Sequence, residues 1–448
     1  MSCLIDSTNN LNILTAVWRE CLRGEIMKSK LWKLLAIFAV LGLIAVGCGD
    51  DDDSSSSSSS EASSSESSSS EEASAEAEEE ECELGRGVSD DKILFGSSQP
   101  MTGNLAALGE QAVLAMEVTK DRINDAGGIN GRMIDFIVQD DAYNPEKTVA
   151  NAQYFIEQEK VFAIWASIGS APLKAAMPIH NENNTLTLFP WAQDLSFYDV
   201  DVNPLFFSVN PSAYAQTFGF GKVLVETYGL DGIKVGLMTI NSVDGQQTVD
   251  GFKDSIGGSA LVDEQTWERD STTYGPQILS FIDSGTTDVY IGTGDTQFAQ
   301  FLLEADQLGL DARFWGSTGT ISANTIELAG DLSEGAYGVN VISSANGDKP
   351  GLNAYREAMF EAGATEAQIS TASLLAYTGG LVLEEGLNRA GECLNSQTLS
   401  AAFESITDFS TGGIMRPLNF SSENHLGNND VIILQVQDGV WVEVENLG

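Results

Sequence analysis

The chain of 448 residues carries 65 Asp and Glu against 22 Lys and Arg, a formal net charge of −43 at pH 7. A phosphate backbone is repelled by such a charge, because nucleic-acid binding needs clustered Lys and Arg, so nucleic-acid function is excluded. The segment Asp50 to Glu83 holds 14 of the acids and no base, which leaves residues 84–448 at −31. Those 365 residues exceed what one hydrophobic core usually organises, so we expect two core-bearing lobes.

An N-terminal segment has the composition of a secretory signal. Lys28, Lys30 and Lys33 precede the uncharged apolar run Leu34–Val46. This run is too short to span a bilayer stably, and its basic side stays in the cytoplasm. The segment therefore predicts export of the chain.

The signal begins at Met27, so we interpret residues 1–26 as a start-site extension and residues 27–47 as the signal peptide. The run ends in small residues directly before Cys48, which resembles the lipobox of bacterial lipoproteins, with Ala45 in place of the usual Leu. The resemblance implies that Cys48 is acylated and anchors the protein to the cell envelope. The alternative is a buried hydrophobic helix with an incidental cysteine.

Residues 48–84 read as a tether. Low hydrophobicity combined with high like charge keeps such a Ser-rich acidic segment disordered and solvated. Cys82, near its end, and Cys393 are the cysteines left in the exported part beyond the anchor. An exported chain sits where disulfides persist, so these two either pair or remain free thiols, and their spacing does not decide between the two.

Short apolar runs alternate with amphipathic stretches from Lys92 onward. The predicted strands are Ile93–Gly96, Met133–Val138, Val161–Ala166, Leu186–Phe189, Val235–Thr239, Leu261–Trp267, Asp288–Ile291, Arg313–Gly316 and Tyr337–Ile342. The predicted helices between them are Leu105–Ala126, Pro145–Gln158, Pro172–Glu182, Ala213–Tyr228, Gln247–Ile256, Tyr274–Ser284, Thr296–Leu308 and Asn324–Leu328. Apolar strands separated by helices indicate an α/β fold with buried parallel sheets.

The C-terminal part departs from this alternation. Two helices are predicted over Ser370–Ala390 and Ser396–Ser405. Three strands are predicted after them, over Met415–Phe420, Val431–Gln437 and Val440–Val444. The last two are separated by Asp438-Gly439, a two-residue hairpin signal.

Several segments carry a family resemblance: QPMTG at 99–103, LAALGE at 105–110, INDAGGINGR at 123–132, QDDAYNPEKT at 139–148, and Leu303 to Thr320. They resemble the type I periplasmic solute-binding proteins of ABC transporters, in the leucine/isoleucine/valine-binding branch. The resemblance covers roughly Lys92 to Val444. It implies two Rossmann-like lobes joined by three crossovers and closing on a solute between them.

Mapped onto this chain, the resemblance implies that residues 90–207 and 344–409 form lobe 1 and residues 208–343 and 410–448 form lobe 2. The crossovers would lie near Ser208–Pro211, Ser343–Asn346 and Ser410–Gly413. These stretches are polar or rich in Gly and Pro, as hinge segments require.

The family holds the polar end of its solute with hydroxyl and N–H groups in the loops after the third and fourth strands of lobe 1. The matching candidates in this chain are Ser167, Gly169, Ser170, Trp191, Ala192 and Gln193, with Leu108 added from the first motif. Ser170 also reads as a plain helix N-cap. Gln193 stands where amino-acid binders carry a threonine, and its amide can still donate.

Lobe 2 matches the family less closely. Ser242 and Val243 occupy the loop that often carries a tyrosine, and Thr318 stands where amino-acid binders place the acid that meets the α-ammonium group. Asp295 is the candidate to replace that acid, and its alternative role is a helix cap. An unpaired ammonium group in a closed cleft would cost several kcal/mol.

The resemblance implies a lipid-anchored receptor that hands a branched-chain or other hydrophobic amino acid to an ABC permease and its ATPase. Aromatic or short-chain carboxylic acids or amides are the alternative solutes, and Trp191 would suit stacking on a ring. A sensory receptor with the same fold is a second alternative.

The sequence contains no recognisable catalytic motif. His180 and His425 belong to no cluster with metal-ligand spacing. The chain has no Gly-x-Ser-x-Gly elbow and no Walker A sequence. We therefore expect a binding protein without metal or cofactor rather than an enzyme.

Overall fold

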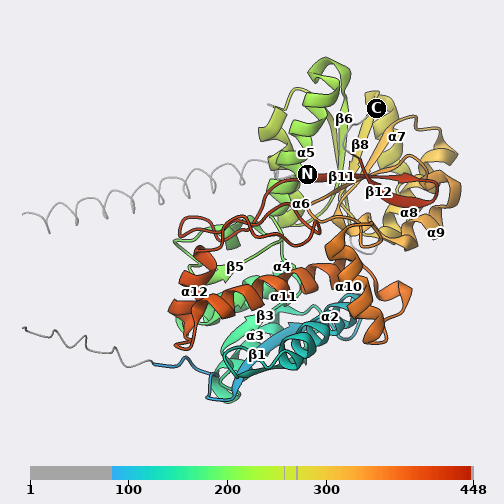
Figure 1. Cartoon of the computed structure of the whole chain (residues 1–448). Helices are drawn as coiled ribbons and strands as arrows, with labels where there is room; N and C mark the ends of the chain where they lie inside the picture. The colour runs from blue at the N-terminus through green and yellow to red at the C-terminus, as the bar shows by residue number, and fades with distance from the viewer. Residues whose placement is uncertain (1–82, 257, 269–270, 445–448) are drawn as a thin grey trace, which may run out of the picture. The chain divides into compact units, whose positions relative to one another are not determined.

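The computed structural model describes residues 83–256, 258–268 and 271–444, which belong to one compact unit. The predicted extension, signal peptide and tether, with Cys48 and Cys82, lie outside the described residues except for the end of the tether. The described chain forms two lobes, each built on a mostly parallel sheet with helices on both faces, as the sequence predicts (Figure 1).

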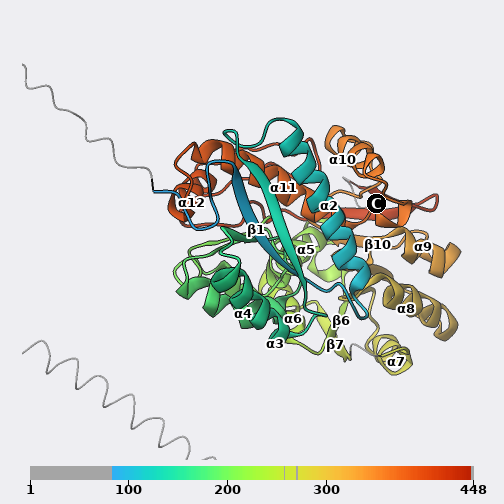
Figure 2. The same ribbon diagram turned by 90° about the horizontal axis from the view of Figure 1, so that it is seen from below.

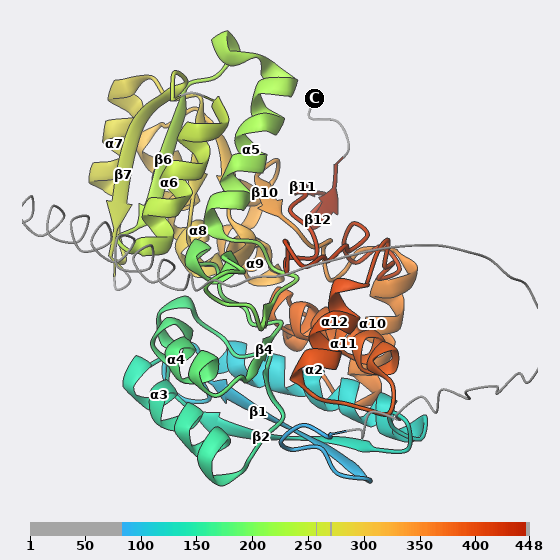
Figure 3. The ribbon, with the colours of Figure 1, turned by 90° about the vertical axis from the view of Figure 1, so that its left-hand side faces the viewer.

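Lobe 1 contains a five-stranded, fully parallel sheet in the order β2-β1-β3-β4-β5. Its strands are β1 (Lys92–Gln99), β2 (Met133–Asp140), β3 (Ala163–Trp165), β4 (Leu186–Leu188) and β5 (Phe206–Phe207). Its helices are α2 (Ala106–Asp125), α3 (Pro145–Gln153), α4 (Ser170–Glu182), α10 (Pro350–Glu361), α11 (Thr371–Ala390) and α12 (Ser396–Glu404). Helices α3 and α4 lie on one side of the sheet, and α2 and α11 on the other (Figure 3).

Alternation of side chains decides which face of this sheet each residue covers. In β1, Ile93 and Phe95 are fully buried in the main core of lobe 1, whereas Leu94 packs into a separate cluster on the opposite face. Helix α3 begins where the sequence signals it: the Asn144 side chain accepts hydrogen bonds from two backbone N–H groups, with Pro145 at the first helical position.

Lobe 2 contains a seven-stranded sheet in the order β12-β11-β10-β9-β8-β6-β7. Its strands are β6 (Val235–Ile240), β7 (Leu261–Trp267), β8 (Asp288–Ile291), β9 (Arg313–Gly316), β10 (Tyr337–Asn340), β11 (Ile432–Gln437) and β12 (Val440–Glu443). Its helices are α5 (Ala213–Tyr228), α6 (Val243–Ile256), α7 (Gly275–Ser284), α8 (Asp295–Leu308) and α9 (Ala323–Ala329).

Strand β11 pairs antiparallel with β10 and β12, and the other pairings in this sheet are parallel. Asp438 and Gly439 join β11 to β12 with φ values of 52° and 74°, as a tight hairpin turn requires. The β8 strand shows why this sheet is buried on both faces, since Val289 and Ile291 pack toward α7 and α8 while Tyr290 packs toward α5 and α6.

The third crossover differs from the expected position near Ser410–Gly413. Ile414, Met415, Leu418 and Phe420 are buried in the core of lobe 1, because the segment folds back against the residues that precede it. The predicted strand Met415–Phe420 is absent there, and only an isolated bridge joins Phe409 to Leu418. The chain therefore stays with lobe 1 beyond this point and enters the lobe 2 sheet at β11.

The first and third crossovers run side by side. Ser208 bridges to Leu426, the Ser208 N–H donates to the His425 carbonyl at 3.0 Å, and the Gly427 N–H donates to the Ser208 carbonyl at 3.0 Å. The view in Figure 2 shows the C-terminal strands on the side of lobe 2, whereas α11 and α12 lie with lobe 1. Among the described residues, no helix combines the length and apolar character needed to cross a membrane.

Candidate functional site

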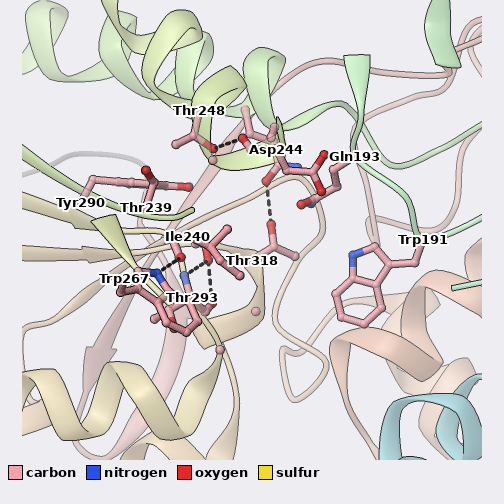
Figure 4. A pocket seen from close by; sticks show the side chains of 17 residues that line it. Trp191, Gln193, Thr239, Ile240, Asp244, Thr248, Trp267, Tyr290, Thr293 and Thr318 are labelled. Carbon is pink, nitrogen blue, oxygen red and sulfur yellow. Dashed lines mark hydrogen bonds between the residues drawn. The ribbon is translucent and has the colours of Figure 1, made fainter. Parts of the chain in front are cut away.

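A cavity of about 210 Å³ opens where the strands β6 to β9 of lobe 2 end (Figure 4). Lobe 1 contributes Trp191 and Gln193 to its lining. Lobe 2 contributes Ala213, Gln216, Thr239, Ile240, Asp244, Gly245, Thr248, Trp267, Tyr290, Gly292, Thr293, Gly294, Ser317, Thr318 and Gly319. Parallel sheets place their ligand sites beyond the carboxyl ends of the strands, so the cavity lies where this topology predicts a ligand site.

The first turn of α6 brings the charged side chain of the cavity into place. Asp244 is the one Asp, Glu, Lys or Arg among the described lining residues. A Cβ atom on Gly245 would lie 1.9 Å from the Ile240 carbonyl oxygen, so only glycine lets this turn press so closely onto the end of β6. The Thr248 hydroxyl donates to the Asp244 carbonyl at 3.0 Å and fixes the turn further.

Hydroxyl groups from the loops after β8 and β9 form the polar floor. The Ser317 hydroxyl joins these two loops, because it donates to the Thr293 carbonyl at 2.9 Å and accepts from the Thr293 N–H at 3.2 Å. The Thr318 hydroxyl donates to the Gln216 side chain at 2.9 Å. The Thr293 hydroxyl is buried without a hydrogen-bond partner among the described residues, and Thr293 is one of the residues that line the cavity.

Aromatic rings form the apolar wall. The Trp267 indole N–H donates to the Gly292 carbonyl at 3.1 Å, which fixes the ring at the end of β7. Tyr290 is 3% exposed, and its burial raises the pKa of the phenol, which therefore stays neutral. Trp191 faces this wall from lobe 1 (Figure 4).

In lobe 1 the loops after β3 and β4 bond to each other. The Trp191 N–H donates to the Ser167 carbonyl and the Gly169 N–H donates to the Trp191 carbonyl, both at 2.9 Å. The Ser170 hydroxyl accepts from the Gln193 N–H at 2.9 Å and makes no helix-capping bond, so it does not act as the N-cap that its sequence context suggests.

Gly169 belongs to the same arrangement. Its φ of +113° lies in the region that favours glycine, and a Cβ atom there would lie 2.5 Å from the Tyr143 ring. These bonds hold Trp191 and Gln193 against the rest of lobe 1. The two loops therefore act as a backing for the two lobe 1 residues that reach the cavity.

The predicted site residues occupy three kinds of position. Trp191, Gln193 and Thr318 line the cavity. Ser167, Gly169, Ser170 and Ala192 are buried behind that lining, and Leu108 packs against the lobe 1 core without reaching the cavity.

The remaining predicted residues lie at helix starts of lobe 2. Ser242 accepts from the Gly245 N–H at 3.2 Å, and Val243 is 57% exposed. The Asp295 carboxylate accepts from the Thr296 N–H at 2.6 Å and from the Ser322 hydroxyl at 2.9 Å, which is a structural role at the start of α8. None of the three is among the residues that line the cavity.

Sequence reasoning missed Asp244, Trp267 and Tyr290. Trp267 is the last residue of β7, Tyr290 is the last but one of β8, and Asp244 lies in the first turn of α6 after β6. The available signal was their position near strand ends, since ligand sites follow the strands of a parallel sheet. Asp244 lies one position after the predicted Val243, where a helical start turns one side chain to solvent and the next into the cavity.

Cys393 is disulfide-bonded, so of the two alternatives left open for this cysteine it is not the free thiol, and Cys82 lies outside the described residues. The described part of the chain holds no group of three or more His, Cys, Asp and Glu side chains that could bind a metal ion.

Two lobes that share a solute-sized cavity at the ends of parallel strands define a two-lobed solute-binding protein. The family model for periplasmic binding proteins matches residues 92–440. The chain belongs to this periplasmic binding protein family, in the type I group that includes the Leu/Ile/Val-binding proteins.

Known proteins agree with this assignment. The "Leucine-, isoleucine-, valine-, threonine-, and alanine-binding protein" of Pseudomonas aeruginosa is 24% identical over 351 residues, covering 77% of this chain and 90% of its own. A branched-chain amino acid ABC transporter protein from Thermus thermophilus, solved with bound valine, superposes with a TM-score of 0.71 at 22% identity, covering 81% of this chain and 97% of its own. A solute-binding protein from R. palustris in complex with benzoate superposes with a TM-score of 0.67 at 19% identity, covering 79% and 95%.

Proposed function

We propose that the protein captures a small hydrophobic amino acid and delivers it to an ABC permease and its ATPase. The observation that supports this proposal is the chemistry of the cavity: an aromatic wall, a floor of hydroxyl groups, and Asp244 as the one charged side chain among the described lining residues. This combination suits an apolar body that bears one positively charged group.

Size limits the solute. Pockets for drug-sized ligands occupy roughly 300–1,000 Å³. The cavity holds about 210 Å³, so it suits a solute no larger than a free amino acid or a similar compound.

Charge distinguishes an amino acid from a simple carboxylic acid. An ammonium group buried without a partner costs several kcal/mol, and Asp244 offsets that cost. A benzoate-like anion would instead meet a like charge in a cavity whose described lining offers no Lys or Arg. The side-chain amide of Gln193 and the free Thr293 hydroxyl are the donors that suit the carboxylate of an amino acid.

Relatives support the same assignment. The Pseudomonas aeruginosa protein is named for binding leucine, isoleucine, valine, threonine and alanine, and the Thermus thermophilus protein was solved with valine. The benzoate complex from R. palustris shows that the same fold accepts an aromatic acid, so the solute class must be decided by the cavity.

Export and anchoring complete the proposal. The signal at residues 27–47 and the acylated Cys48 would hold the protein at the cell envelope, with the acidic tether up to residue 84 as a spacer. Binding without turnover is part of the same proposal, so the solute should be recovered unchanged after incubation with the protein.

Calorimetry with L-leucine, 4-methylpentanoate and benzoate tests the proposal. We expect L-leucine to bind, and 4-methylpentanoate, which lacks the ammonium group, to bind far more weakly. Asp244→Asn should cost about 2–4 kcal/mol, a loss of roughly 30- to 1,000-fold in leucine affinity, because it leaves a buried ammonium without its counter-charge.

Asp295→Asn is the matched control, because this carboxylate bonds Thr296 and Ser322 outside the cavity lining. It should change leucine affinity by less than about threefold. Binding of benzoate with no binding of any amino acid would show that the assigned solute class is wrong.

A further inference from the structure

A contact between the lobes lies beside the cavity, and one glutamine makes it. The Gln247 side chain, on α6 of lobe 2, accepts a hydrogen bond from the Leu195 N–H at 2.8 Å. Its amide nitrogen donates to the Asp194 carboxylate at 3.1 Å. Asp194 and Leu195 belong to lobe 1 and directly follow Gln193, which lines the cavity.

Lobe 1 holds Asp194 in place for this contact. Asp194 is 2% exposed, and its carboxylate accepts from the Lys174 ammonium at 2.5 Å and from the Ser196 N–H at 2.9 Å. Burial alone would raise the pKa of Asp194, but the hydrogen bonds from Lys174, Ser196 and Gln247 outweigh it and lower the pKa. The carboxylate is therefore a fixed, ionised acceptor that faces lobe 2.

Helix α6 carries both the contact and the cavity. Asp244, Gln247 and Thr248 are three and four positions apart, so they lie on one face of the helix. Asp244 and Thr248 line the cavity, and Gln247 bonds lobe 1. A solute that fixes the position of α6 beside the cavity therefore also fixes the position of Gln247 in the contact between the lobes.

We propose that the Gln247 side chain is a latch that holds the two lobes together over a bound solute. The inference rests on the proposed function, in that solute binding and lobe closure are taken to occur together. Gln247 acts as a positioning residue: it does not line the cavity, and it works through Asp194 and Leu195.

An amide suits this contact, because it donates and accepts within one group, whereas a carboxylate only accepts. Gln247→Glu would keep the bond from the Leu195 N–H but place a second negative charge beside Asp194. Gln247→Ala would remove both bonds and leave the Asp194 oxygen with the Ser196 N–H.

Gln246 offers a matched control. It is the same residue type at the preceding position, it is exposed, and its amide donates to Asp250 of the same helix at 2.9 Å. Gln246→Ala therefore removes a glutamine from α6 without touching the contact between the lobes.

The test measures leucine release by stopped flow on the full exported protein. Gln247→Ala should release leucine roughly tenfold faster than the wild type, Gln247→Glu faster still, and Gln246→Ala at the wild-type rate. Equal release rates for Gln247→Ala and Gln246→Ala would overturn the latch.

Small-angle scattering without any solute separates this proposal from the assigned function. If leucine does not bind the wild type, the function is wrong, but the latch still predicts a larger radius of gyration for Gln247→Ala than for Gln246→Ala. An unchanged radius for Gln247→Ala in that case would overturn the latch as well.

Discussion

The two lobes share one architecture but take different parts in the site. Lobe 2 presents side chains directly from the ends of β6 to β9, and its α6 brings in the charged group Asp244. In lobe 1 the equivalent loops bond to each other, and of the described lobe 1 residues Trp191 and Gln193 alone reach the cavity. Under the proposed function, we expect lobe 2 to decide which solute binds and lobe 1 to supply a rigid surface against which lobe 2 closes.

The largest expected effect comes from the two tryptophans on opposite sides of the cavity. Trp267 is 5% exposed and belongs to the core of lobe 2, so Trp267→Ala should cost about 3–5 kcal/mol of stability, measured by urea unfolding. Trp191 is half-buried at the edge of the lobe 1 core. Trp191→Ala should therefore lower leucine affinity by about 1–2 kcal/mol with little change in stability. Equal stability losses for both variants would remove the distinction between the lobes.

Acid should weaken lobe 1 before lobe 2. His180 is buried in lobe 1 with its Nδ1 atom 2.9 Å from the Thr187 hydroxyl, and burial, helped by Arg86, lowers the pKa of its ring to about 4. The unfolded chain takes up this proton near pH 6.5 and the folded chain only near pH 4, so stability falls as the pH drops through that window.

Between pH 7 and pH 5 this single group should cost about 2 kcal/mol. Hydrogen exchange should show loss of protection in lobe 1 first, because the chain has two histidines and the other, His425, stacks on Phe207 of lobe 1. His180→Asn should flatten the pH dependence. A slope that is unchanged in that variant would exclude His180 as the cause.

The smallest effect tests the backing role of the lobe 1 loops. Ser170→Ala removes the acceptor of the Gln193 N–H and should cost about 1 kcal/mol, or roughly fivefold in leucine affinity. Val243→Ala at the exposed start of α6 is the comparison in lobe 2 and should stay within about 0.5 kcal/mol of the wild type. If Val243→Ala weakened binding more than Ser170→Ala, the sequence-based view of Val243 as a contact residue would be favoured.

Most of the fold could be predicted from patterns of apolar residues. The bounds of β7, β8, β9 and α5 match the predicted ranges. Turn or capping residues mark their ends, as Gly292 does after β8 and Ser212 before α5, although β7 (LVDEQTW) is not an apolar run. The two-residue strand β5 and the helix α10 were not predicted, since β5 is too short to show a period.

The segment from Met415 to Phe420 shows the limit of the same method. Its apolar residues are buried as predicted, yet they pack as an irregular chain against lobe 1 rather than as a strand. A sequence shows which residues are buried, whereas tertiary contacts decide whether a buried segment forms a strand and against which lobe it packs.

The candidate site was predictable as a region but not residue by residue. Thr318, Trp191 and Gln193 follow strand ends and line the cavity. Ser170 and Asp295 follow strand ends as well, but backbone and hydroxyl groups of neighbouring loops use their polar atoms. Which residue of a loop faces a cavity depends on the turn geometry. For Asp244, the close packing of Gly245 on the Ile240 carbonyl sets that geometry.

Because β11 lies near the C-terminus, its partner β10 stays unpaired on one side during most of the synthesis of the chain. Strand β10 pairs with β11, which is separated from it in the chain by the helices α10 to α12 of the other lobe. A chain that emerges N-terminus first therefore leaves one side of β10 without a neighbour until almost its last residues have appeared. Such an open strand edge invites pairing with other chains. A protein that ends just before Ile432 should therefore aggregate, although it keeps every residue that lines the cavity.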